Sequence, residues 1–166
     1  MVLVEDSRQQ QWDGDKHSNI HRYCSRAGIE IMRTALPYGD YCLIDPETGE
    51  PDLSISVDTK QNMLEIMGNI MNSRDHVRFK AECVKAQEAG SQLVILIEEI
   101  PPLGMIELWE SPLNRQGKPF TRANPVLFAK CIKTMTERYG VRFVFCDKRQ
   151  TGRVLIDILT GKFRIT

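Results

Sequence analysis

Apolar and polar residues recur along the chain with two different periods, and each change of period marks the boundary of a predicted element. Short apolar or alternating runs are typical of strands and predict them at residues 2–5, 29–36, 40–44, 53–60, 92–99 and 141–146. Apolar residues at helical spacing, flanked by capping residues and glycines, predict helices at residues 18–27, 63–70, 74–89, 124–139 and 151–159. The predicted order is β-α-β-β-β-α-α-β-α-β-α.

Two segments predict how the strands pair. The octapeptide Asp-Pro-Glu-Thr-Gly-Glu-Pro-Asp at residues 45–52 is rich in turn-forming residues and predicts an antiparallel hairpin between the strands on either side. The run Gln-Leu-Val-Ile-Leu-Ile at residues 92–97 is almost uniformly apolar, which is typical of a parallel strand covered on both faces. Together they predict an α/β fold, a three-layer α/β/α sandwich on a mixed sheet.

Length and charge limit the class of protein. The chain has 166 residues, of which 42% are hydrophobic, and this suits one domain with its own core. Lysine plus arginine and aspartate plus glutamate number 22 each. This balance argues against a protein coated in positive charge and leaves room only for a local basic surface, so polyanion binding is neither indicated nor excluded.

The cysteines and the apolar runs bear on the compartment. The five cysteines form no Cys-x-x-Cys pair and are odd in number, so neither a disulfide framework nor a zinc site of the usual spacing is indicated. The first six residues are too short and too acidic for a signal peptide, and residues 93–97, the longest apolar run, are too short to cross a membrane. We therefore expect a cytoplasmic, reducing location, in a nucleoid or a nucleus depending on the source, and no membrane partner.

Two carboxylates mark the ends of the predicted hairpin. Asp40 begins one arm and Asp58 ends the other, so antiparallel pairing places them at the same edge of the sheet. Neighbouring carboxylates raise each other's pKa unless a cation lies between them, and Mg²⁺ or Mn²⁺ suits such oxygen ligands. Lys60 follows Asp58 by two residues and shares its face of the strand. With a metal that activates water, these three side chains predict a hydrolytic site for a phosphodiester.

A simpler interpretation is a surface salt bridge between Asp58 and Lys60. Asp-x-Lys is a common tripeptide, and an exposed pair of this kind contributes about 0–1 kcal/mol. The Gly-Asp at residues 39–40, the hairpin and the helix that follows it favour the hydrolytic site.

Several motifs, in the same order, resemble a known family. The runs at residues 28–43, Val-Asp-Thr-Lys at residues 57–60 and Leu-Val-Ile-Leu-Ile-Glu-Glu at residues 93–99 are similar to the XPF-type nuclease domain of the PD-(D/E)xK nuclease superfamily. The opening Val-Leu-Val-Glu-Asp-Ser-Arg at residues 2–8 also fits, because such domains begin with a strand that ends in Asp-x-Arg. The resemblance implies a restriction-endonuclease-like fold in a single domain over 1–166, with a catalytic half at residues 1–99 and a divergent loop and α-β-α extension at residues 100–166.

The resemblance also implies the roles of individual residues. The catalytic positions are occupied by Asp6, Asp40, Asp58 and Lys60, with Asp40 and Asp58 as the metal ligands. The implied DNA contacts are Arg8 and Arg78, and two further acids nearby are weaker candidates, Glu65 and Glu82.

The chain departs from the family signature at two positions. Thr59 stands where the family has arginine, and Leu64 stands where it has an acid four residues past the lysine. Glu65 is one position late, in the first turn of a predicted helix, where the helix dipole favours an acid whatever its role.

These observations favour a Mg²⁺- or Mn²⁺-dependent endodeoxyribonuclease, and the resemblance implies branched or flapped DNA and roles in repair or recombination. The two departures favour an alternative, a catalytically inactive nuclease fold that binds DNA or a protein partner. A Holliday-junction resolvase or a restriction enzyme of the same superfamily would share the site and differ in substrate. The resemblance also implies pairing with a second subunit, as a homodimer, for which residues 124–166 are the candidate surface, with Phe143, Phe145, Ile156 and Leu159.

Other polar and aromatic residues have two interpretations each. His17 and His21 have a spacing that can bind a metal, although no third ligand lies near them. The loop Asn-Arg-Gln-Gly-Lys-Pro-Phe-Thr-Arg at residues 114–122 either contacts phosphates or is simply solvated. Trp12 and Trp109 either stack on a base or cover the core, and packing is the favoured interpretation.

Overall fold

The computed structural model describes residues 1–8 and 18–163. Its strands are β1 (Val2–Asp6), β2 (Glu30–Thr34), β3 (Tyr41–Ile44), β4 (Pro51–Lys60), β5 (Gln92–Ile97) and β6 (Arg142–Phe145). Its α-helices are α1 (Ser18–Ala27), α2 (Met63–Met71), α3 (Ser73–Glu88), α4 (Pro125–Tyr139) and α5 (Thr151–Leu159). Short 3₁₀ turns are η1 (Pro102–Gly104), η2 (Ile106–Leu108) and η3 (Lys148–Gln150).

The strands form one mixed sheet in the order β2-β1-β3-β4-β5-β6. The β1–β3 and β3–β4 pairs are antiparallel, whereas β1–β2, β4–β5 and β5–β6 are parallel. The register between β3 and β4 shifts between Tyr41 and Leu43, so the hairpin is irregular near the end that carries Asp40. The predicted mixed sheet, its hairpin and the order of its elements are confirmed.

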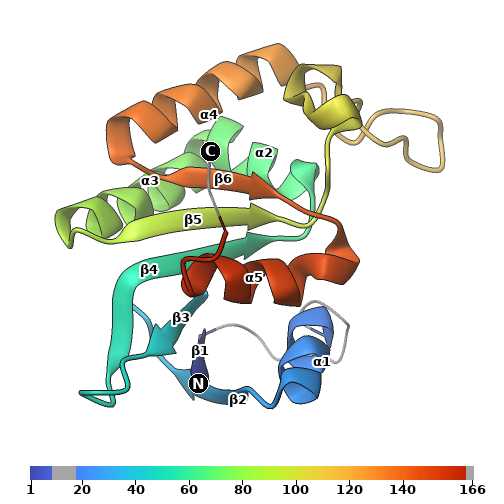
Figure 1. Cartoon of the computed structure of the whole chain (residues 1–166). Helices are drawn as coiled ribbons and strands as arrows, with labels where there is room; N and C mark the ends of the chain where they lie inside the picture. The colour runs from blue at the N-terminus through green and yellow to red at the C-terminus, as the bar shows by residue number, and fades with distance from the viewer. Residues whose placement is uncertain (9–17, 164–166) are drawn as a thin grey trace.

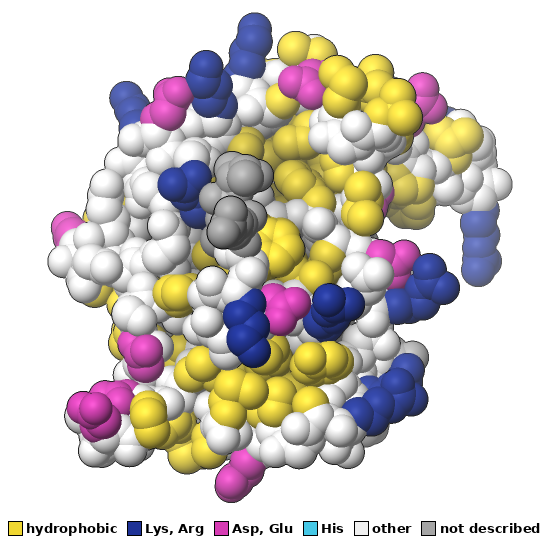
Figure 2. All heavy atoms as spheres, viewed as in Figure 1, with side chains coloured by type: hydrophobic (Ala, Val, Ile, Leu, Met, Phe, Trp, Pro, Cys, Tyr) yellow, Lys and Arg dark blue, Asp and Glu magenta, His cyan; other side chains and the backbone are white. Residues whose placement is uncertain are grey.

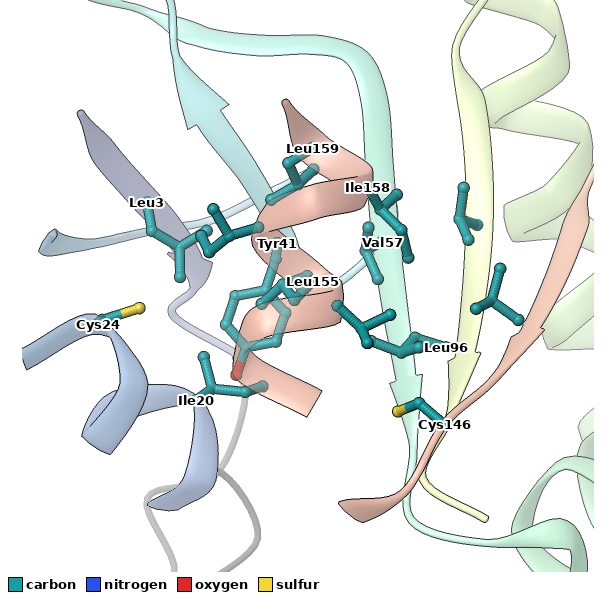
Figure 3. Close-up of a cluster of buried hydrophobic side chains, with 14 of the residues drawn as sticks. Leu3, Ile20, Cys24, Tyr41, Val57, Leu96, Cys146, Leu155, Ile158 and Leu159 are labelled. Atoms are coloured by element: carbon teal, nitrogen blue, oxygen red, sulfur yellow. The ribbon is translucent and has the colours of Figure 1, made fainter. Parts of the chain in front are cut away.

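Helices cover both faces of the sheet, which gives the predicted three layers (Figure 1). On one face, α1 and α5 pack over a cluster that includes Leu3, Tyr41, Val57 and Leu96 (Figure 3). On the other face, α2, α3 and α4 pack over alternate residues of β5, such as Ile95 and Ile97. The nearly uniform apolar character of β5 therefore follows from burial on both faces.

Local sequence signals fix the ends of the helices. The Asn62 side chain caps α2 by accepting a hydrogen bond from the Glu65 N–H at 2.9 Å. Asn124 caps α4, Pro125 occupies its first turn, and Gly140 ends it in a left-handed conformation with φ of 67°. These are the residue types that the two ends of a helix favour.

Some segments differ in detail from their predictions. The predicted strand at residues 29–36 is shorter, because Leu36 leaves the sheet and is buried in the turn that follows. In the segment expected to offer a pairing surface, Ile156 and Leu159 are buried in the core, and Phe143 and Phe145 pack against it. These four side chains therefore serve the chain's own core.

All five cysteines are free thiols. None of the helices formed by residues 1–8 and 18–163 is both long enough and apolar enough to span a membrane.

Candidate active site

Asp40 lies immediately before β3 and is hydrogen-bonded to β4. Its backbone N–H donates to the Val57 carbonyl at 2.8 Å. Its Oδ2 accepts hydrogen bonds from both the backbone N–H and the hydroxyl of Thr59, each at 2.8 Å. Thr59, one of the two departures from the family signature, therefore has a structural role that fixes the Asp40 carboxylate beside the end of β4.

Asp58 and Lys60 form a buried ion pair on the sheet face covered by α2, α3 and α4. They lie in register with Ile95 and Ile97 of β5, whose side chains face those helices. The Lys60 ammonium contacts Asp58 Oδ1 at 2.8 Å, and the side chains are only 13% and 4% exposed. The expected contact on one face of the strand is present, and its burial excludes an ordinary surface salt bridge.

The second oxygen of Asp58 has no hydrogen-bond partner among the residues described, although it is buried. Burial raises the pKa of the Asp58 carboxyl well above its ordinary value, and repulsion from Asp40 and Glu82 adds to this effect, while Lys60 opposes it. Burial alone lowers the pKa of the Lys60 ammonium, but the carboxylates of Asp58 and Asp40 outweigh burial and raise it. Lys60 is therefore protonated at neutral pH.

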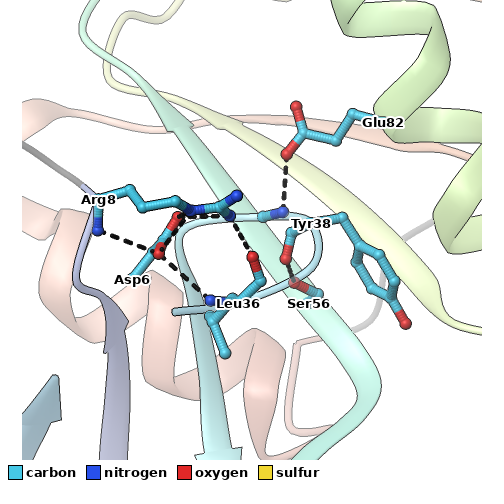
Figure 4. Close-up of polar contacts among 7 residues, drawn as sticks. Asp6, Arg8, Leu36, Tyr38, Ser56 and Glu82 are labelled. Carbon is cyan, nitrogen blue, oxygen red and sulfur yellow. Dashed lines mark hydrogen bonds and ion pairs between the residues drawn. The ribbon is translucent and has the colours of Figure 1, made fainter. Parts of the chain in front are cut away.

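Asp6 holds Arg8 at the end of β1 (Figure 4). The Asp6 carboxylate accepts hydrogen bonds from Arg8 Nε at 3.1 Å, from Arg8 Nη2 at 2.9 Å and from the Leu36 N–H at 3.2 Å. Arg8 Nη2 also donates to the Leu36 carbonyl. Burial opposes ionisation of Asp6, but these hydrogen bonds, above all those from Arg8, outweigh it and lower the pKa of the carboxyl.

Glu82 supports the turn that leads into Asp40. It lies on α3, and its Oε1 accepts a hydrogen bond from the Gly39 N–H at 2.8 Å (Figure 4). Gly39 has φ of +68° and packs so closely on β4 that a Cβ there would lie 2.1 Å from Ser56 Oγ. Only glycine satisfies both conditions, which explains the Gly-Asp pair at this point of the sequence.

The remaining predicted residues lie farther out. Arg78 is exposed on α3, one turn before Glu82. Glu65 accepts a hydrogen bond from the Gln61 N–H at 2.8 Å, so it helps to cap α2, while its charge also raises the pKa of Lys60. The ends of β1 and β4, the turn before β3 and helix α3 therefore bring together Asp6, Arg8, Asp40, Asp58, Lys60 and Glu82.

The carboxylate oxygens at this site are suitable ligands for Mg²⁺ or a similar divalent cation. Asp40 Oδ1 makes no hydrogen bond to the described residues, and Asp58 Oδ2 has no partner there either. Residues 1–8 and 18–163 contain no group of three or more histidine, cysteine, aspartate or glutamate side chains placed to hold a metal. Two carboxylates nevertheless suit Mg²⁺, which keeps several waters and is commonly held by one or two carboxylates together with substrate phosphates.

Comparison with known proteins places this geometry in a family. The model of the ERCC4 domain family matches residues 6–157, which is most of the chain. The chain belongs to the ERCC4 domain family. The match extends well past residues 2–99, where the recognisable motifs lie, and it confirms the resemblance to XPF-type nuclease domains.

Solved structures agree with this assignment at the level of the fold. XPF from Aeropyrum pernix matches with a TM-score of 0.64 and 17% identity, over 99% of this chain and 66% of that one. XPF from Aeropyrum pernix in complex with DNA matches with a TM-score of 0.57 and 20% identity, over 99% of this chain and 67% of that one. The ERCC4 domain described here thus spans about two thirds of these XPF chains. A search of curated proteins gives no match.

The sequence did not reveal a second polar cluster, which lies on the α1 and α5 face of the ERCC4 domain. Buried Glu5 accepts a hydrogen bond from the Tyr41 hydroxyl at 3.2 Å, and its carboxylate lies 3.3 Å from His21 Nε2 and 3.4 Å from Arg33 Nε. His21 is therefore engaged with a carboxylate, and its predicted partner His17 lies outside the described residues, as does Trp12. The acid Glu5, which directly follows the apolar residues 2–4 on the first predicted strand, was the available signal for this cluster.

Proposed function

We propose that this ERCC4 domain is a Mg²⁺- or Mn²⁺-dependent endodeoxyribonuclease that hydrolyses phosphodiester bonds. The observation that carries the proposal is the buried Asp58 carboxylate, with one oxygen paired to Lys60 and the other, near Asp40 and Glu82, without a hydrogen-bond partner among residues 1–8 and 18–163. Burying such an oxygen next to like charges is unfavourable, and a bound cation removes the penalty. Family membership, and the likeness to XPF solved in complex with DNA, support DNA as the substrate.

Asp40 and Asp58 are the residues that would hold the metal. When bound, such an ion stabilises negative charge on a phosphoryl oxygen and lowers the pKa of water. Thr59 orients Asp40 by occupying its Oδ2 and leaving Oδ1 available. Glu82 stabilises the same turn from α3 through the Gly39 N–H, so both carboxylates are held on rigid elements.

Lys60 acts as a hydrogen-bond donor in this proposal. A protonated ammonium cannot accept a proton from water, so it holds the attacking water or a phosphate oxygen and offsets the negative charge that develops in the transition state. Its contact with Asp58 keeps it at the site.

Arg8 supplies a second positive charge at the edge of the site. Asp6 and the Leu36 carbonyl fix the guanidinium, while the side chain stays 60% exposed. A fixed, exposed guanidinium matches the geometry of a phosphate. Arg78, exposed on α3, is the other residue proposed to contact the DNA backbone, and branched or flapped DNA remains the substrate implied by the resemblance.

Cleavage of a substrate panel tests the proposal. Supercoiled plasmid, blunt duplex, flap, fork and four-way junction are incubated with Mg²⁺ or Mn²⁺. We expect metal-dependent cutting that is lost in Asp58→Ala and in Lys60→Ala and is kept in Lys85→Ala, a change of an exposed residue on α3. Cutting that survives in Asp58→Ala would contradict the assignment of the site.

A second candidate is a DNA-binding module without hydrolytic activity. It is favoured by Thr59 and Leu64, and by the lack of a third acidic ligand among the described residues. Tight DNA binding by the unchanged protein, with no cutting of any substrate in either metal, would establish this alternative. The same substrate panel therefore decides between the two functions.

A further inference from the structure

The connection between β5 and α4, residues 98–124, begins beside the catalytic lysine. The Glu98 N–H donates to the Lys60 carbonyl at 2.8 Å. The next residue, Glu99, accepts hydrogen bonds from the Met63 N–H at 2.8 Å and from Trp109 Nε1 at 2.7 Å. Trp109 is 4% exposed. These half-buried contacts of Glu99 fix the connection to the first turn of α2, three residues past Lys60.

The far part of the connection is an ordered hairpin. The Asn114 N–H donates to the Lys118 carbonyl at 2.8 Å, and the Phe120 N–H donates to the Pro112 carbonyl at 3.0 Å. The Asn114 side chain accepts hydrogen bonds from two further N–H groups of the turn. Figure 1 shows this segment projecting beyond the start of α4, on the side where β4 and β5 end.

The hairpin is cationic on its outer part. Arg115, Lys118 and Arg122 are exposed, and no hydrogen bond or ion pair within the described residues engages their side chains. The carboxylates of Glu107 and Glu110 precede the hairpin, so positive charge is confined to residues 115–122. Figure 2 shows positive charge at the outer end of this segment, and hydrophobic side chains that gather where η1, η2 and the start of α4 lie.

The base of the hairpin and α2 enclose a groove of about 510 Å³. Its walls are mainly apolar and comprise Leu64, Met67, Gly68, Met71, Asn72, Phe120, Thr121 and Ala123. Phe120 is 64% exposed at this groove. Leu64, which stands where the family has an acid, therefore lines this groove.

We propose that this groove receives an unpaired nucleotide of a DNA strand whose backbone runs along Arg115, Lys118 and Arg122. An exposed ring beside unpartnered cations is the combination that binds single strands, because every base can stack on an aromatic ring and every phosphate attracts a cation. The walls offer few polar groups, so binding is independent of base identity. In a duplex the bases are already stacked, so only a single-stranded segment can enter.

This inference rests on the proposed nuclease function and names the part of the substrate that the connection recognises. A strand positioned at Lys60 continues past the first turn of α2 into the groove. The connection therefore directs the hydrolytic site to DNA that has a single-stranded arm next to the scissile bond.

Binding measured in EDTA tests the groove without any cleavage. Labelled single strands, forks and blunt duplexes are titrated with the full chain. We expect Phe120→Ala to weaken binding to single strands and forks by about 5- to 150-fold, the value of one base–aromatic stack, and to change blunt-duplex affinity less than about twofold on the same basis. The matched control is Val77→Ala on α3, which is 69% exposed and should leave all affinities unchanged. Phe120→Trp retains a stacking ring and should retain the affinity.

The cationic part is tested by the salt dependence of binding. Replacing Arg115, Lys118 and Arg122 with glutamine should make the negative slope of log K against log salt for single strands shallower by about 2, that is about 0.7 for each of three phosphate contacts. Replacing the exposed Lys85, Arg142 and Lys162 should leave the slope unchanged. Unaltered single-strand affinity in Phe120→Ala, or an equal loss for blunt duplex, overturns the inference. If the wild type cuts no DNA but Phe120→Ala still loses single-strand binding, the hydrolytic function is refuted. The proposal that the groove binds a single-stranded nucleotide is then still supported.

Discussion

At Gly39 the structure predicts a clear effect of adding a single methyl group. Its backbone has φ of +68°, and an added Cβ would lie 2.1 Å from Ser56 Oγ and 3.3 Å from both Ser56 Cβ and the Val57 carbonyl oxygen. That same carbonyl accepts the Asp40 N–H at 2.8 Å. A substitution here therefore disturbs the turn, the strand beneath it and the carboxylate that follows.

The expected destabilisation of Gly39→Ala has two sources. Placing alanine in the left-handed region costs about 1–2 kcal/mol. Ser56 Oγ must also move away, which breaks its hydrogen bond to the Tyr38 carbonyl at 3.2 Å, and a neutral hydrogen bond is worth about 1 kcal/mol. The free energy of unfolding should therefore fall by about 2–3 kcal/mol, the sum of these two contributions.

Urea denaturation of three variants separates these sources. Gly49→Ala is the matched control, because Gly49 has φ of +74° but no atom within 4 Å of an added Cβ, so it should show only the conformational cost of about 1–2 kcal/mol. Ser56→Ala should cost about 1 kcal/mol. The double variant Gly39→Ala/Ser56→Ala should be no less stable than Gly39→Ala, because the same hydrogen bond is lost in both.

Two results would refute this reasoning. One is a Gly39→Ala variant as stable as Gly49→Ala, which would mean that the close packing on Ser56 has no energetic consequence. The other is strict additivity of Gly39→Ala and Ser56→Ala, which would mean that the two side chains do not compete for the same space. Gly39→Ala should also reduce metal-dependent cleavage, because Asp40 moves with the turn.

Three further predictions follow from the charges at the site. Glu82→Gln keeps an acceptor for the Gly39 N–H but removes a charge that raises the pKa of Asp58, so the acid limb of the pH profile of cleavage should move to lower pH; a limb that stays in place or moves to higher pH would contradict this. Asp6→Asn should lower the free energy of unfolding at pH 7 by about 1–3 kcal/mol through lost charge-assisted hydrogen bonds. The pKa of Asp6 is lowered from 3.8 in the folded protein. The difference in free energy of unfolding between wild type and Asp6→Asn, measured by urea denaturation, should therefore shrink as pH falls below about 4 and vanish below the folded pKa. A difference that stays constant with pH would contradict this prediction. Mg²⁺ at ten times its dissociation constant should stabilise the wild type by about 1.4 kcal/mol, measured as a shift in thermal unfolding, and should not stabilise Asp58→Asn; equal stabilisation of both would place the metal elsewhere.

The local features of this protein were predictable from its sequence. Capping residues and apolar periodicity predicted the order of the elements and both ends of α1 and α5, because these signals act over a few neighbouring residues. The contact of Lys60 with Asp58 was predictable for the same reason, since residues two apart on a strand share a face. The turn-rich residues 45–52 likewise predicted the hairpin that joins β3 to β4.

The sequence could not show how deeply the pair is buried or what surrounds it. Asp58 lies on a face that α2, α3 and α4 cover, and Glu82 reaches Gly39 across 43 positions of sequence. Similarly, only the packed structure shows that Leu64 and Phe120 line one groove. Such pairings are fixed by which helix faces pack on the sheet, and periodicity within one element carries no information about them.

The sequence by itself therefore determined the elements of this ERCC4 domain and the residue types at the ends of its strands, because backbone geometry is set largely by near neighbours. The tertiary structure alone decided that β1 lies on the other side of β3 from β4, which adds Asp6 to the edge where the predicted hairpin already placed Asp40 and Asp58. It also decided that Asp58 is buried with one oxygen unpartnered among the described residues. Charge and burial together produce the binding chemistry, and burial exists only once distant segments have packed against one another.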